Sequence, residues 1–379
     1  MDEQTSMKCI LIIPNLLVGG TQRAMCNLAL GLANRGREVS LIVIHRSDKT
    51  YGNLDTPRLD IGPLVEAGVE IVYLNRQNVI YSGFSVLRAV LAAKPDIVMS
   101  SLSYLNLYLS FIFLMLPKRI AYIVRESNVL SVKHSHTFGS GLLRIVYSLS
   151  YKLVDHVVCQ SQDMYEDLSQ NFGVDKEKMI VINNGVDVER LNTLALEPLD
   201  YELNKSCINV VSVGHLTNQK GHDLLIKALA AMKRDDVIVH IAGRGPLKQE
   251  LENLSEELGV RHQVVFHGFM SNPFPLIKAC DLFVLASRFE GFPNALVEAR
   301  TLGIPVLASN CRGGIFEILG TSDRSFQNDD SDDLKDKLAD FVRVYLSERK
   351  PKKVSTKEFS LQAMSRKFDK YFSSITRGV

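Results

Sequence analysis

The sequence predicts an α/β protein built from two doubly wound domains, each around its own parallel sheet. The chain of 379 residues is too long for one ordinary hydrophobic core. Apolar strand-like runs alternate with amphipathic helical patterns in the first half, which is typical of a parallel sheet. The alternation pauses at the turn-forming residues 183–187, continues as a polar connector to Lys205, and then begins again.

The first half of the chain supplies one set of elements. Short runs rich in β-branched residues predict strands, and segments with helical periodicity predict the helices between them. The strands are expected at 9–13, 39–44, 69–74, 97–99, 120–124, 157–159 and 179–182, and helices at 21–34, 84–93, 141–153 and 162–171.

The second half repeats the pattern and ends in one further helix. Strands are expected at 208–213, 237–241, 264–266, 282–285 and 306–308, and helices at 221–232, 247–258, 273–280 and 293–302. A basic linker at 349–353 then precedes a last amphipathic helix. Its apolar residues, at helical spacing, are Phe359, Leu361, Met364, Phe368, Tyr371 and Phe372.

Composition indicates a globular protein and excludes several classes. Hydrophobic residues make up 46% and charged residues 23% of the chain, and the net charge of +2 implies no strong field for nucleic acid. The six cysteines are scattered, several in apolar runs, so we expect reduced core thiols in a cytoplasmic protein. Residues 1–7 are polar and acidic and do not resemble a signal peptide.

Residues 104–116 form the most apolar stretch, shorter than the ~20 residues that cross a bilayer. Two interpretations remain open: a helix buried within the α/β domain, or one that also contacts membrane or another subunit. From 75 to 165 there are nine basic and four acidic residues, so the difference is +5. This basic region predicts either contact with anionic membrane or a solvated face.

Two glutamates, Glu290 and Glu298, stand eight positions apart on either side of Gly291, Phe292, Pro293 and Asn294. The preceding apolar run predicts a buried strand, which places Glu290 on the loop that leaves it. Pro293 suits the first turn of a helix, and Glu298 falls about two turns into that helix. Free amides and the positive dipole end of the helix favour an anion there, and the two carboxylates suit hydroxyl groups. The pattern is typical of a nucleotide-sugar site.

The stretch EGFPNALVEA resembles the Glu-x7-Glu motif of retaining family-4 glycosyltransferases of the GT-B fold. The resemblance implies two Rossmann-like domains facing across a cleft. The N-terminal acceptor domain would span 1–190 and the nucleotide-sugar domain 205–355. Residues 356–379 would form a helix that crosses back to the N-terminal domain.

Other loops match the same family. Gly19 and Gly20 follow the first strand, where the family has a glycine loop near the donor diphosphate and acceptor. Gly214, His215 and Lys220 resemble the family's G-R-x-x-x-x-K-G loop, whose cations neutralise the diphosphate. Histidine at position 215 departs from the usual arginine. It is titratable and lacks the bidentate fork, so more of the phosphate role falls to Lys220.

Three further segments complete the predicted site. In the family, the loop with Gly243 and Arg244 borders the nucleotide, and the loop with His267 and Gly268 contacts the base, largely through backbone groups. His267 either bonds or stacks there, or is an edge residue without a ligand. Arg125, at the end of the fifth strand, stands where the family holds a His or Arg near the transferred sugar. The alternative is a surface pair of Arg125 with Glu126.

No metal site is expected. His134, His136 and His156 lack a metal-binding spacing, and Asp330-Ser331-Asp332 is interpreted as a helix cap although it fits the D-x-D pattern.

The resemblance implies a metal-independent retaining glycosyltransferase without a cofactor. Its catalytic residues would be Glu290, Lys220, His215 and Arg125. The donor would be a nucleotide diphosphate sugar, with UDP preferred and GDP-mannose as the alternative. The acceptor would be a lipid-linked or oligosaccharide glycan of a bacterial surface polysaccharide, met in the cytoplasm at the inner face of the membrane. A nucleotide-sugar epimerase of the same fold and a silent binding module are the alternatives from other classes.

Overall fold

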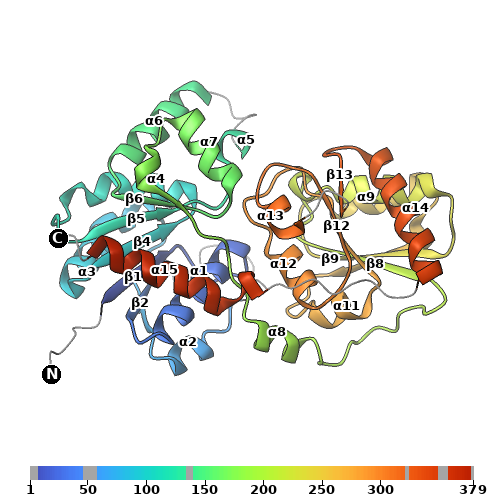
Figure 1. The fold of residues 1–379 in the computed structure, drawn as a ribbon, viewed down its shortest axis with the longest axis horizontal. Helices are drawn as coiled ribbons and strands as arrows, with labels where there is room; N and C mark the ends of the chain where they lie inside the picture. Colours follow the sequence, from blue (N-terminus) through green and yellow to red (C-terminus); the bar gives the residue numbers. More distant parts are fainter. Residues whose placement is uncertain (1–6, 46–57, 134–139, 321–323, 349–356, 377–379) are drawn as a thin grey trace. The chain divides into compact units, whose positions relative to one another are not determined.

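The computed structural model describes residues 7–45, 58–133, 140–320, 324–348 and 357–376 (Figure 1). The chain forms two compact units. The first combines Met1–Gly185 with Glu358–Val379, and the second is Val186–Lys357.

The first unit contains a seven-stranded sheet in the order β3-β2-β1-β4-β5-β6-β7, and every paired neighbour is parallel. The chain winds outward from β1 in one direction and from β4 in the other, so the order reverses between these two strands. The strands are β1 (Lys8–Ile13), β2 (Glu38–Val43), β3 (Glu70–Tyr73), β4 (Ile97–Ser101), β5 (Ala121–Arg125), β6 (His156–Cys159) and β7 (Met179–Val181).

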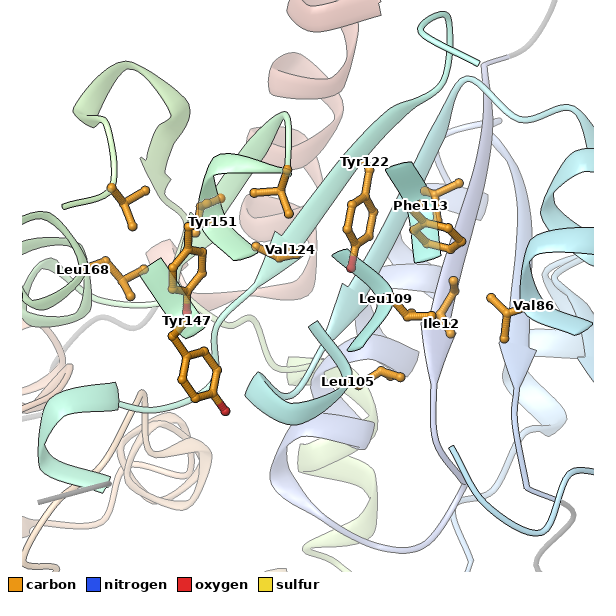
Figure 2. Close-up of a cluster of buried hydrophobic side chains, with 14 of the residues drawn as sticks. Ile12, Val86, Leu105, Leu109, Phe113, Tyr122, Val124, Tyr147, Tyr151 and Leu168 are labelled. Carbon is orange, nitrogen blue, oxygen red and sulfur yellow. The ribbon is translucent and has the colours of Figure 1, made fainter. Parts of the chain in front are cut away.

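Helices cover both faces of this sheet because its side chains alternate between two cores. Ile10 and Ile12 of β1 belong to one core, and Cys9, Leu11 and Ile13 belong to the other. Figure 2 shows the first core, where α3, α4, α6 and α7 contribute Val86, Leu105, Leu109, Tyr147, Tyr151 and Leu168. The helices of the unit are α1 (Gly20–Ala33), α2 (Gly62–Glu66), α3 (Gly83–Ala93), α4 (Ser103–Ile112), α5 (Leu130–Lys133), α6 (Ser140–Lys152), α7 (Gln162–Phe172) and α15 (Leu361–Thr376).

The second unit contains a six-stranded parallel sheet in the order β10-β9-β8-β11-β12-β13. Here the winding direction reverses between β8 and β11. The strands are β8 (Ile208–Val213), β9 (Val237–Ala242), β10 (Val264–Gly268), β11 (Leu282–Leu285), β12 (Val306–Ser309) and β13 (Ser325–Phe326). The helices are α8 (Val188–Leu194), α9 (His222–Met232), α10 (Lys248–Glu257), α11 (Phe274–Ala279), α12 (Asn294–Thr301), α13 (Ile315–Leu319) and α14 (Ser331–Glu348).

The two parallel-sheet domains confirm the predicted fold class, and every predicted strand is present. The residues expected to form a polar connector after 187 instead begin with a helix, α8. The side chain of Asp187 caps this helix by accepting from the Arg190 amide at 3.1 Å. Such a cap stabilises the first turn of a helix even where the sequence is polar. The short elements α2, α5, α13 and β13 were not predicted.

The apolar stretch 104–116 forms most of α4 and the 3-10 turn η2 (Phe113–Met115). Leu105 and Leu109 are fully buried on the sheet side, whereas Leu114 and Met115 are exposed. Among the described residues, no helix combines the length and the apolar character needed to cross a membrane.

Candidate functional site

The candidate site of the second unit lies at the reversal point of its sheet. Lys220 belongs to η4 (Asn218–Lys220), in the loop after β8, and Glu290 belongs to the loop after β11. Since β8 and β11 are adjacent and parallel, both loops leave the same edge. Open α/β sheets bind ligands at this kind of edge and switch point.

Glu290 is a buried carboxylate, 6% exposed. Its Oε1 accepts from Lys220 Nζ at 2.5 Å and from Ser287 Oγ at 2.7 Å. Ser309 Oγ in turn donates to the carbonyl of Ser287. The structure therefore brings together two of the predicted site residues, Glu290 and Lys220, as an ion pair with a second donor on the carboxylate.

Glycines allow the loops of this edge to interlock. A Cβ on Gly243 would lie 1.8 Å from the carbonyl oxygen of Gly214, and one on Gly221 would lie 2.0 Å from that of Ala286. Gly221 also has a positive φ of 61°, which L side chains rarely adopt. The Gly243 amide donates to the Gly268 carbonyl at 2.7 Å, which ties in a third loop. Three of the predicted glycines, Gly214, Gly243 and Gly268, thus lie in contact at one edge.

Arg288 fastens the Lys220 loop to the Glu290 loop, a role that the sequence did not reveal. Its Nη1 donates to Asp223 Oδ1 at 2.9 Å and to the Asn218 carbonyl at 2.7 Å, and its Nη2 donates to Asp223 Oδ2 at 2.8 Å. The Arg288 amide donates to the Gln219 carbonyl at 2.8 Å, and Gln219 Nε2 donates to the Phe289 carbonyl at 2.9 Å. Arg288 lies two residues before the EGFPNALVEA stretch, but its partner Asp223 is 65 positions away.

His215 lies at the start of the Lys220 loop, with part of its side chain exposed and part buried. Partial burial of the ring lowers the pKa of His215, and a hydrogen bond with the Arg244 backbone raises it. The charges of Lys220 and Arg244 lower this pKa further. The guanidinium of Arg244 lies over the Phe269 ring, 5.0 Å from its centroid. The imidazole of the free protein is therefore neutral near pH 7.

Glu298 lies on α12 and is 5% exposed. Because the helix begins at Asn294, with Pro293 at the N-cap position, Glu298 is in its second turn, close to the predicted position. Phe292, in the loop before the helix, is also buried, and a Cβ on Gly314 would lie 2.3 Å from its ring. Gly291 accepts from the Gly314 amide at 2.8 Å, which holds the loop before α12 in place.

The ring of His267 contacts other side chains of the protein. Its Nε2 lies 3.0 Å from His240 Nδ1, and His240 Nε2 lies 3.0 Å from Asn209 Oδ1. Tyr201 packs edge-on, with its ring centroid 5.0 Å from that of His267. Burial lowers the pKa of both histidines, to about 4 for His240. A role for the His267 ring in base binding stays a prediction, whereas the neighbouring Gly268 backbone belongs to the interlocked loops.

The first unit places the glycine loop at the reversal point of its own sheet. Gly19 is the N-cap of α1 and its carbonyl accepts from the Arg23 amide at 3.0 Å; Gly20 is the first residue of the helix. A Cβ on Gly19 would lie 2.6 Å from Gln22 Oε1. Gln22 Nε2 donates to Asn15 Oδ1 at 3.2 Å. The glycine thus fits a tight turn between β1 and α1.

Arg125 ends β5 and is 1% exposed, so the alternative of a surface pair with Glu126 is wrong. Its guanidinium donates to Asn184 Oδ1, and to Ser101 Oγ at 3.3 Å. Burial lowers the pKa of Arg125 to about 10 even though the charge of Glu126 raises it. Glu126 accepts from Ser103 Oγ at 2.9 Å and from Asn106 Nδ2 at 2.8 Å. Both side chains belong to a buried polar network, and a sugar contact by Arg125 stays a prediction.

The metal candidates of the sequence do not form a cluster in the part of the chain that the structure describes, where no group of three His, Cys, Asp or Glu residues is arranged to hold a metal. His134 and His136 lie outside the described residues. Asp330 Oδ1 accepts from the amides of Asp332 and Asp333 at 2.9 and 3.0 Å, which confirms the predicted helix cap at the start of α14.

Two family models match this chain. Residues 18–190 match the model described as Glycosyltransferase Family 4, and residues 200–357 match the model described as Glycosyl transferases group 1.

Curated relatives agree with these models. An N-acetylgalactosamine-N,N'-diacetylbacillosaminyl-diphospho-undecaprenol 4-alpha-N-acetylgalactosaminyltransferase of Campylobacter jejuni is 34% identical over 214 residues, which are 56% of this chain and 57% of that protein. This chain thus matches little more than half the length of that relative. An uncharacterized glycosyltransferase of Haemophilus influenzae is 24% identical over 352 residues, covering 91% of this chain and 93% of the relative.

Solved structures share the fold. HepE from Anabaena in complex with UDP-glucose superposes with a TM-score of 0.73 at 19% identity, covering 97% of this chain and 100% of the other. Together with the two parallel-sheet units and the matched models, this places the chain in the family-4 glycosyltransferases of the GT-B fold.

Proposed function

We propose that this protein is a retaining, metal-independent glycosyltransferase that moves a hexose or N-acetylhexosamine from a UDP-sugar to a polyprenyl diphosphate-linked glycan. The observation that carries the proposal is the ion pair of the partly buried Lys220 with the buried Glu290 at the reversal point between β8 and β11. A cation and a carboxylate held side by side suit a ligand with both phosphate charge and sugar hydroxyls.

The proposed reaction replaces one bond at the anomeric carbon. The acceptor hydroxyl oxygen bonds to that carbon while the bond to the diphosphate oxygen breaks, and the departing diphosphate takes the hydroxyl proton. Attack on the face that the diphosphate leaves retains the configuration. Lys220 would stabilise the negative charge that grows on the diphosphate, and Glu290 would orient the transferred sugar. Glu298 would accept hydrogen bonds from the ribose.

Relatives support the choice of donor and acceptor. The Campylobacter protein is named for transfer of N-acetylgalactosamine to a diphospho-undecaprenol-linked sugar. A second relative, from Escherichia coli, is named as a UDP-Gal:alpha-D-GlcNAc-diphosphoundecaprenol alpha-1,3-galactosyltransferase and is 28% identical over 171 residues. The structural likeness to a UDP-glucose complex is consistent with a UDP donor.

A donor panel tests the proposal. Purified protein is incubated with UDP-glucose, UDP-galactose, their N-acetylhexosamine counterparts and GDP-mannose, with and without undecaprenyl diphosphate-linked acceptors. We expect transfer from one UDP-sugar, an α-linkage by NMR, and full activity in EDTA. Transfer from GDP-mannose alone would show that the donor is not a UDP-sugar. Loss of activity in EDTA with rescue by Mn²⁺ would contradict the metal-independent mechanism. Conversion of the donor without an acceptor would indicate an epimerase.

Glu290→Gln is the matched variant for this assay. The amide still accepts a hydrogen bond but carries no charge, so turnover should fall while the affinity for free UDP stays within about twofold of the parent. Equal loss of turnover and of UDP affinity would assign Glu290 to nucleotide binding rather than to the sugar.

A further inference from the structure

We propose that the outer surface of the α3–α4–α6 layer is a docking surface for an anionic lipid bilayer. The proposal goes beyond the chemistry of the donor site and stands without it, because it rests on residues of the first unit alone. It rests on three observations: the three helices are adjacent, their outer sides carry apolar stripes, and the exposed charge around the stripes is positive.

The three helices form one continuous layer. α4 packs against both α3 and α6. Tyr108 of α4 accepts from the Gly83 amide at 3.2 Å and donates to the Ile80 carbonyl at 2.5 Å, so the start of α3 is fastened to α4. The inner sides of the layer fill the core shown in Figure 2, where Leu105, Leu109 and Tyr147 face the sheet. The opposite sides of these helices therefore face outward.

The outward sides are apolar in a helical pattern. On α6, Leu142, Ile145 and Leu149 follow the spacing i, i+3, i+7 and are 72%, 57% and 47% exposed. Phe84 of α3 is 77% exposed, and Leu114 and Met115, directly after α4, are 61% and 74% exposed. We call these six side chains the apolar face. Exposed apolar side chains gathered on adjacent helices are typical of an interaction surface.

The charge around the apolar face selects the partner. Between residues 80 and 152 the exposed acid among the described residues is Asp96, whereas seven bases are exposed: Arg88, Lys94, Lys118, Arg119, Lys133, Arg144 and Lys152. Glu126 is buried and already hydrogen-bonded. A symmetric contact between two copies would bring this positive surface against itself, whereas anionic lipid headgroups neutralise it. The apolar side chains would enter the headgroup region while the helices lie along the surface.

Sedimentation with vesicles tests the surface without donor or acceptor. The protein is mixed with phosphatidylcholine vesicles, and with vesicles containing about one-third phosphatidylglycerol. We expect binding to the anionic vesicles and weak binding to neutral ones. The quadruple variant Phe84→Ser, Leu114→Gln, Met115→Gln and Leu142→Gln should lower the partition coefficient about tenfold or more. The charge variant Lys118→Glu, Arg119→Glu and Arg144→Glu should remove the preference for phosphatidylglycerol.

A control variant changes four exposed apolar residues of the second unit: Leu196→Gln, Leu258→Gln, Phe316→Ser and Val344→Gln. It should bind vesicles like the parent. Equal binding of the parent and the quadruple variant, or equal binding to both lipid mixtures, would overturn the proposal. So would a parent dimer that becomes monomeric in the quadruple variant, because the apolar face would then join two copies. UDP affinity, measured by calorimetry, should be unchanged in the quadruple variant, which separates this result from any failure of the donor site.

Discussion

At the residue scale, short sequence motifs predicted the site residues, whereas the contacts that hold these residues in place join positions far apart in the sequence. Glu290, Glu298 and Lys220 were predicted because each stands in a short motif next to a strand. The contacts of Arg288 with Asp223 and of Ser309 with Ser287 join positions 65 and 22 apart, so no local pattern contains them. The burial of Arg125 was missed for the same reason, since Asn184 is 59 positions away.

Glu298 provides the most direct test of nucleotide binding. Its carboxylate is 5% exposed on the helix that follows the Glu290 loop. If it accepts from the ribose hydroxyls, Glu298→Ala loses charge-assisted hydrogen bonds, and UDP affinity should fall by roughly one to two decades. Titration calorimetry with UDP measures this, and Glu257→Ala on the exposed side of α10 is the control. Unchanged affinity in Glu298→Ala would contradict the assignment.

His215 predicts a pH dependence. Burial and the cations Lys220 and Arg244 hold its pKa below the ordinary 6.5, so the free protein carries little charge there at pH 7. Bound diphosphate would raise that pKa. If the imidazolium assists the leaving diphosphate, kcat/KM, which reports the free enzyme, should fall as pH rises through the lowered pKa, and kcat should persist to higher pH.

Variants separate this role from a structural one. His215→Arg should flatten the profile, and His215→Ala should cost about 2–4 kcal/mol of transition-state stabilisation. Initial rates between about pH 5 and 9 measure this, with the exposed His262→Ala as the control. If His215→Ala retains the parent's rates at every pH, Lys220 acts without it.

At the element scale, long segments with apolar periodicity were predicted. Very short elements, and elements held by contacts with distant parts of the chain, were not. α1, α9 and α10 show apolar periodicity within one segment, which a sequence pattern captures. β13 has two residues and pairs with β12 at the edge of the sheet, and so short a strand shows no periodicity in the sequence. α5 has four residues, and Ser131 beside its start is held by Asp167 of α7, a contact from another element.

The junction of the Lys220 and Glu290 loops predicts a positioning role for Arg288. Burial opposes the charge of Asp223, but the hydrogen bonds and charge of Arg288 hold the pKa of Asp223 below its usual range. Arg288→Ala should loosen the loop that carries Lys220 and lower kcat/KM about tenfold, mainly by raising KM for the donor. Arg288→Lys should restore little, because an ammonium lacks the bidentate fork.

A double-mutant cycle of Arg288→Ala with Asp223→Ala measures the coupling in donor kinetics. We expect clear non-additivity. The matched cycle of Arg234 and Asp236, a bidentate pair 40% and 43% exposed, should show no coupling in kcat/KM. Additive effects of Arg288 and Asp223 would mean that the pair does not position the loop.

At the scale of the whole molecule, the last helix returns to the first unit. α15 packs on α1 in the same core as β1, with Phe368 and Phe372 fully buried. The approach requires small residues, since a Cβ on Gly31 would lie 2.7 Å from the Ser365 Cβ. The helical spacing predicted α15 itself, and its return came from the family resemblance, because nothing in the local sequence identifies Gly31 as its partner.

Asp369 fastens this helix and predicts an acid-sensitive contribution to stability. Its carboxylate accepts from Arg35 Nε at 3.1 Å and from Arg37 Nε at 2.6 Å. Burial opposes its charge, but the hydrogen bonds and charges of both arginines lower its pKa below the usual value. A depressed folded pKa stabilises the fold above the unfolded pKa of about 3.9, and the contribution is lost as pH falls through the folded value.

Asp369→Asn should therefore lower the free energy of unfolding of the first unit by roughly 1–3 kcal/mol at pH 7. Protection of the β1 amides from hydrogen exchange measures this loss, because β1 belongs to the core that α15 covers. The loss should shrink as pH falls through the folded pKa, since the parent carboxylate is then protonated as well. Asp340→Asn, in an exposed pair with Arg343, is the control and should leave β1 protection unchanged at both pH values. An equal loss of protection at neutral and acid pH would mean that the charge of Asp369 does not hold α15 in place. The apolar contacts of α15 with α1 and β1 would then do so instead.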